Sequence, residues 1–177
     1  MKTIPDLLSQ LRQRSDCAFT DPEPFGDLNF NGLTLPADVI EFYTLAGSAV
    51  LFPDNFGWIA PKLRELALYE PKTFQEEYET RILTGRLRPD LCWSWFWFGC
   101  TNHDAADELV LDLSPVLKGW IYAAYWPDHA AEDGRGDIVV AKSFTEFLNR
   151  LVIGEGDWGQ EGAFEGHGSP IVPETWH

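Results

Sequence analysis

Residues 92–126 read CWSWFWFGCTNHDAADELVLDLSPVLKGWIYAAYW, and this stretch decides the fold class of the chain. Apolar or aromatic residues alternate with their neighbours in the runs 92–98, 108–113 and 119–126, and a similar run, DIVVA, follows at 137–141. Alternation with a period of two, in aromatic and branched side chains, is typical of β-strands. Because the connections are too short for crossover helices, we expect neighbouring strands to be antiparallel.

Helical periodicity appears on both sides of these strands. Thr3 is a candidate N-cap for a first helix, and SFTE at 143–146 is a capping box that opens a last one. A second helix begins near Pro36, and its apolar face is formed by Val39, Ile40, Phe42, Tyr43 and Ala46. The full set of expected elements is helices over 3–13, 36–46, 61–69, 73–83 and 143–152, short strands over 49–52 and 56–59, and a loop over 18–33. We therefore predict an α+β fold, in which a mainly antiparallel meander sheet is packed by N-terminal helices and a C-terminal helix. A single α+β domain is expected over 1–153, followed by a Gly-rich, irregular, acidic tail over 154–177.

Composition narrows the class of partner. The formal net charge of −15 disfavours nucleic acid and anionic membranes, since both are bound by basic groups. It favours a basic protein partner, although solubility alone also accounts for it. The N-terminus has no apolar signal-peptide core, no run of apolar residues is long enough to span a membrane, and three cysteines do not make a disulfide framework. We expect a cytoplasmic protein with reduced thiols.

Two similar acidic hexamers lie within the predicted meander. They are HDAADE at 103–108 and DHAAED at 128–133. In a meander, alternate connections come out at the same edge of the sheet, so both hexamers are expected at one edge. The residues that would form this acidic edge are His103, Asp104, Asp107, Glu108, Asp128, His129, Glu132 and Asp133.

The hexamers admit several chemical interpretations. Imidazole and carboxylate groups suit divalent metals, but the H-E-x-x-H, EF-hand and paired-thiol spacings are missing. Nucleophile and phosphate-loop motifs are missing as well, so we predict no catalytic residue, cofactor or metal. A hydrolase or metal-binding protein that uses His103 or His129 stays as an alternative. Another alternative is that both hexamers are solvated loop tips and that their similarity is chance.

A recognition edge for a basic protein is the remaining interpretation. Rim charges mainly raise association rates, whereas aromatic anchors supply affinity. Trp97 and Trp126 are the candidate anchors near the hexamers. Phe98 and Tyr125 are expected to belong to the core instead.

Three segments together resemble the SUKH superfamily of Smi/Knr-like domains. LPADVIEFYTLAGS at 35–48 is similar to the entry helix of that family, and IVVAKSFTEFLNRL at 138–151 to its exit strand and last helix. Between them, FGCTNHDAADELVLDL at 98–113 is similar to its loop and "Leu-x-Leu-Asp" strand. The resemblance covers roughly residues 30–153.

The resemblance implies an α+β binding module without catalytic residues. Fungal relatives regulate cell-wall synthesis, and many bacterial relatives are immunity proteins that neutralise a cognate toxin, often a nuclease. For this chain it implies a protein that binds and neutralises a basic toxin. A scaffold or regulatory interaction protein without a toxin partner is the alternative.

Overall fold

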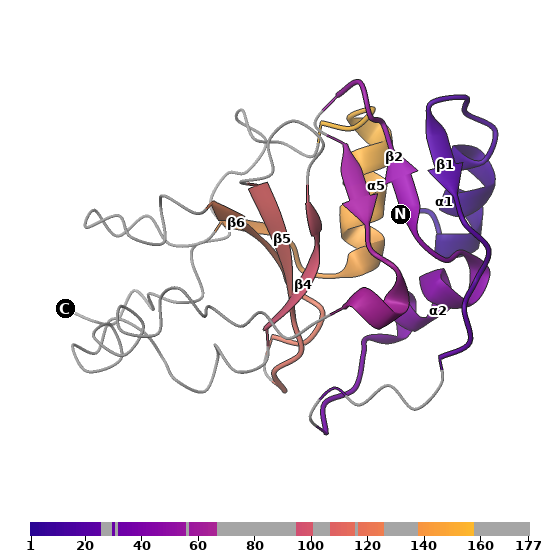
Figure 1. The fold of residues 1–177 in the computed structure, drawn as a ribbon. Coiled ribbons are helices and arrows are strands. Elements are labelled where there is room, and N and C mark those ends of the chain that lie inside the picture. Colours follow the sequence, from indigo (N-terminus) through magenta and orange to yellow (C-terminus); the bar gives the residue numbers. More distant parts are fainter. Residues whose placement is uncertain are drawn as a thin grey trace.

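A computed structural model describes residues 1–25, 30, 32–55, 57–66, 95–100, 107–115, 117–125 and 138–157. The strands within these residues form one seven-stranded sheet in which every neighbouring pair is antiparallel and spatial order equals chain order. They are β1 (Cys17–Phe19), β2 (Ala49–Leu51), β3 (Trp58–Ala60), β4 (Trp95–Cys100), β5 (Asp107–Asp112), β6 (Ile121–Tyr125) and β7 (Ile138–Ala141). The α-helices described are α1 (Ile4–Leu11), α2 (Ala37–Leu45) and α5 (Phe144–Ile153). The predicted α+β meander is confirmed (Figure 1).

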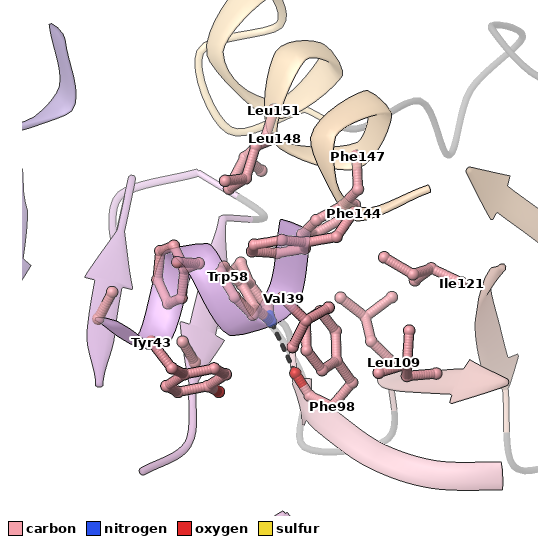
Figure 2. Close-up of a cluster of buried hydrophobic side chains, with 14 of the residues drawn as sticks. Val39, Tyr43, Trp58, Phe98, Leu109, Ile121, Phe144, Phe147, Leu148 and Leu151 are labelled. Carbon is pink, nitrogen blue, oxygen red and sulfur yellow. Dashed lines mark hydrogen bonds between the residues drawn. The ribbon is translucent and has the colours of Figure 1, made fainter. Parts of the chain in front are cut away.

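The helices and one face of the sheet share a single hydrophobic core. Buried residues of α1, α2 and α5 pack in one cluster with alternate residues of the strands, such as Leu51, Phe98 and Leu109. Trp58 of β3 lies at its centre, with ring centroids of Phe42, Phe98, Phe144 and Phe147 at 5.7, 5.2, 5.6 and 5.3 Å (Figure 2). Its indole Nε1 donates a hydrogen bond to the carbonyl oxygen of Phe98 at 2.9 Å. The buried ring therefore satisfies its one polar group within the sheet.

Local signals set where two of these helices begin. The hydroxyl of Thr3 accepts from the backbone N–H of Asp6, and the carboxylate of Asp6 accepts from the N–H of Thr3. Ser143 accepts from the N–H of Glu146 at 3.1 Å, but the carboxylate of Glu146 accepts from the N–H of Lys142, so only half of the predicted capping box forms. Both caps confirm the predicted helix starts, because they satisfy donors that the first turn leaves without helical partners.

One glycine permits the close approach of β3 and β4. Gly99 has φ +116°, and a Cβ atom there would lie 2.2 Å from the carbonyl oxygen of Ile59. The register of β4 against β5 shifts between Trp97 and Gly99. The glycine and the bulge together let Phe98 remain in the core while Cys100 pairs with Ile59.

The structure corrects parts of the predicted element map. The expected loop over 18–33 overlaps β1, and Ile40, predicted on the buried face of the second helix, is 40% exposed. The helix expected over 61–69 is described only as a 3-10 turn, Leu63–Glu65. The helix expected over 73–83 lies outside the described residues. Among the helices described, none has the length and apolar character needed to cross a membrane.

Candidate interaction edge

The strand register brings the ends of four strands to one edge of the sheet. Asp107, the first residue of β5, pairs with Tyr125, the last of β6, and Cys100 at the end of β4 pairs with Glu108. At the start of β7, Ile138 pairs with Ala123 of β6. We call this the loop edge. The segments 101–106 and 126–137, which contain most of both hexamers, connect strand ends that share it.

Most of the predicted site residues lie outside the described residues. These are His103, Asp104, Asp128, His129, Glu132, Asp133 and the candidate anchor Trp126. Asp107 and Glu108 begin β5 at the loop edge, and only their backbone is described. Trp97 lies in β4 opposite Val110 and is partly exposed. Phe98 is fully buried, as predicted for a core residue.

The loop edge continues across the first half of the sheet. Cys17 at the start of β1 pairs with Leu51 at the end of β2, which pairs with Trp58 at the start of β3. Asp16 precedes β1, Asp54 is exposed in the connection between β2 and β3, and Glu155 and Asp157 follow α5. Sequence reasoning missed these carboxylates. The meander argument, applied to the turn around Asp54, would have placed that residue at the same edge as the hexamers.

Arg14 joins three segments at this edge. Its Nε and Nη2 donate to the two carboxylate oxygens of Asp16, each at 2.8 Å, and its Nη1 lies 3.3 Å from Oε1 of Glu155. Its guanidinium also lies over the ring of Phe52, 4.7 Å from the centroid. The paired hydrogen bonds to the guanidinium lower the pKa of the Asp16 carboxyl. The connection into β1 is thereby tied to the end of β2 and to the end of α5.

Backbone contacts hold the end of α5 against the turn between β2 and β3. The N–H of Gly57 donates to the carbonyl of Gly156 at 3.0 Å, and the side-chain amide of Asn55 donates to the carbonyl of Glu155 at 2.9 Å. Gly156 has φ +101°, and a Cβ atom there would come within 2.5 Å of Phe52. Glycine is therefore required at this contact, and the residues after α5 are held against the turn that contains Asp54.

Three residues with buried polar groups, Tyr43, Asp112 and Asn149, have structural roles. Tyr43 donates to the carbonyl of Pro61 at 3.0 Å, and its burial raises the pKa of its hydroxyl. Asp112 accepts from the N–H of Ser114 at 2.6 Å, at the edge of the sheet opposite the loop edge. Asn149 bonds the backbone N–H and C=O of Lys2, joining α5 to the N-terminus. Within the described residues, no three His, Cys, Asp or Glu side chains come together in a group that could hold a metal ion.

Comparison with known proteins gives two findings. The model of the SMI1 / KNR4 family (SUKH-1) matches residues 29–150, from before α2 to within α5. A protein of Bacillus subtilis (strain 168), named immunity protein YokJ, is 25% identical over 154 residues, which are 87% of this chain and 86% of that protein. The similarity therefore extends beyond the family match on at least one side.

Proposed function

Because this chain belongs to the SMI1 / KNR4 family (SUKH-1), we propose that it is an immunity protein that binds a toxic protein in the cytoplasm and holds it inactive. The observation that carries the proposal is its similarity, over nearly its whole length, to a protein named as an immunity protein. Inhibition by binding needs a complementary surface and no reacting groups. The proposed binding domain spans 1–153, with 154–177 as an added acidic tail.

We propose a basic toxin, for example a nuclease. The chain carries a net charge of −15, and opposite charges speed the encounter of two proteins. The hexamer residues are the proposed acidic edge, with Trp97 and Trp126 as aromatic anchors. Asp54, Glu155 and Asp157 support this choice, since they bring further carboxylates to the loop edge.

The function is tested by co-expression. Fragments of the source genome are expressed from an inducible promoter in a host that lacks this chain, and those that stop growth are expressed again together with it. We expect one growth-arresting basic protein to become harmless when the chain is present and to copurify with it. If the chain rescues growth from no fragment, the proposal is wrong. A partner that copurifies without being toxic would favour the scaffold or regulatory alternative.

The acidic edge is tested with charge-matched variants. Asp104→Lys/Asp133→Lys changes one carboxylate in each hexamer, whereas Glu41→Lys/Glu65→Lys makes the same change in charge at exposed residues away from the loop edge. We expect the first variant to weaken toxin binding about tenfold or more, with a flatter salt dependence, and the control far less. The quadruple variant, with Asp107 and Glu132 also reversed, should bind more weakly still. Equal binding by both double variants would remove the hexamers from the interface.

A further inference from the structure

A row of apolar side chains crosses the first four strands on the face opposite the helices. Ala18, Val50 and Ile59 are register partners in β1, β2 and β3, and Ile59 pairs with Cys100 of β4. Their chain neighbours Ala49, Leu51, Trp58 and Ala60 are buried in the helix-covered core. Because side chains alternate between the two faces of a strand, these four residues share the other face. We call them the apolar row.

The apolar row is accessible to a partner. Val50 is 37% exposed, Ala18 is exposed, and Ile59 and Cys100 are partly exposed. Figure 1 shows β1 and β2 in front of α1 and α5, so this face of the two strands lies toward the viewer. The other large apolar residues that are exposed in the described part of the chain lie at the N-terminus or on α2 and α5: Met1, Ile40, Leu45 and Ile153. Among these exposed large apolar residues of the described part of the chain, Val50 is therefore the one that lies in a strand. Its register partners in the two neighbouring strands, Ala18 and Ile59, are also exposed or partly exposed.

The charges around the row indicate what occupies it. Asp16 and Asp54 lie at the loop-edge ends of β1 and β2, and Asp21 is exposed beyond the other end of β1. Asp16 is paired with Arg14, whereas Asp54 and Asp21 are exposed at the margin. A second copy of the chain would bring another net charge of −15 against these carboxylates. A basic protein would complement them.

We propose that the apolar row is the anchoring surface for the basic toxin, which inserts apolar side chains between Lys or Arg residues that face the carboxylate margin. This inference rests on the proposed function and assigns its surface. The row has small and branched side chains, so it accepts protruding groups from the partner. Apolar groups buried at the centre of an interface supply most of its affinity, while the charged rim contributes mainly to the association rate.

The test compares two arginine substitutions that change the net charge equally. Val50→Arg places a long cationic side chain in the middle of the row, and Ile153→Arg places one at an 82% exposed position at the end of α5. The probe is the purified toxin identified by the co-expression experiment. We expect Val50→Arg to weaken binding at least ~30-fold, mainly through faster dissociation, and Ile153→Arg to bind within about threefold of wild type.

Folding and alternative occupants are controlled separately. Each variant is first compared with wild type by thermal unfolding, and Ala18→Arg, on the edge strand, replaces Val50→Arg if the latter unfolds early. If wild type neutralises the toxin and both row variants do so with unchanged affinity, the row proposal is wrong while the immunity function stands. If no toxin is neutralised by wild type, both proposals fail. A wild-type dimer, seen by sedimentation and dissociated by Val50→Arg, would assign the row to a second copy and overturn the proposal.

Discussion

Strands β1, β2 and β3 have two different faces, although successive residues of each strand belong to opposite faces. On the helix-covered face, Trp58 is enclosed by aromatic rings and donates a hydrogen bond to the next strand. On the other face, Val50 and Ile59 are flanked by small side chains and keep part of their surface in water. On the helix-covered face, shortening any side chain disturbs the packing of the core. On the other face, apolar area is still available for a partner to bury. We therefore expect stability and the proposed binding to be carried by adjacent residues of the same strands.

The largest effect is expected at Trp58. Trp58→Ala removes the ring at the centre of the aromatic cluster and should lower the free energy of unfolding by about 3–5 kcal/mol. Urea unfolding followed by circular dichroism measures it. If the alanine variant does not fold, Trp58→Phe keeps a ring but leaves the carbonyl of Phe98 without its donor, and should cost about 1–3 kcal/mol. Wild-type stability in either variant would contradict the central role of this ring.

A pair of neighbouring residues tests the comparison directly. Leu51→Ala, on the covered face, should lower the free energy of unfolding by about 2–5 kcal/mol. Val50→Ala, one residue earlier on the open face, should lower it by less than about 1 kcal/mol, because little packing is lost at a partly exposed site. The two variants are compared by urea unfolding at equal m-value. Equal losses would mean that the open face is packed as part of the core.

Substituting Ser143, the N-cap of α5, tests how a helix on the covered face contributes to stability without creating a cavity in the core. Ser143→Ala removes the acceptor for the N–H of Glu146 and should lower stability by about 1 kcal/mol. Ser143→Asp keeps an acceptor and is the matched control. Thermal unfolding of the two variants measures the difference. The alanine variant should melt below the aspartate variant, and the reverse order would show that the cap does not determine this helix start.

The smallest effect concerns pH at the loop edge. Pairing with Arg14 lowers the folded-state pKa of Asp16, so its contribution is complete above its unfolded pKa, about 3.9. That contribution is lost as the pH falls through the lowered folded value. Asp16→Asn should therefore melt below wild type near neutral pH by a small margin, since the pair is partly exposed. The margin should shrink below about pH 4, and a margin independent of pH would contradict the pairing.

Much of the sheet was predictable from short-range patterns. Period-two alternation in Trp95–Cys100, Asp107–Asp112 and Ile121–Tyr125 identified strands whose two faces differ, and short connections made them antiparallel. The meander argument also anticipated that the strand ends flanking both hexamers share an edge. That the hexamers themselves form one acidic surface stays a prediction. The strand β1 was missed because Cys17–Phe19 is too short to show a period and lies among turn-forming residues.

Contacts between residues that are far apart in the chain could not be predicted from the sequence. Arg14 meets Glu155 across the ring of Phe52, and neither partner carries a local signal of the other. The apolar row depends on the register of four strands, and a shift of one residue would turn Val50 into the core. The spacing of Ile40 predicts that it continues the apolar face of the helix, yet the position of α2 on the sheet leaves it partly in water.

The amino-acid sequence by itself determined the α+β meander, the starts of α1 and α5, the acidic character and the resemblance to a family of binding proteins. Each follows from local patterns or composition, because alternation, caps and charge act over a few residues or over the whole chain. Only the tertiary structure decided which carboxylates join the loop edge and which apolar side chains remain open. Those outcomes depend on strand register and on where the helices cover the sheet, which are set by contacts between residues far apart in the chain.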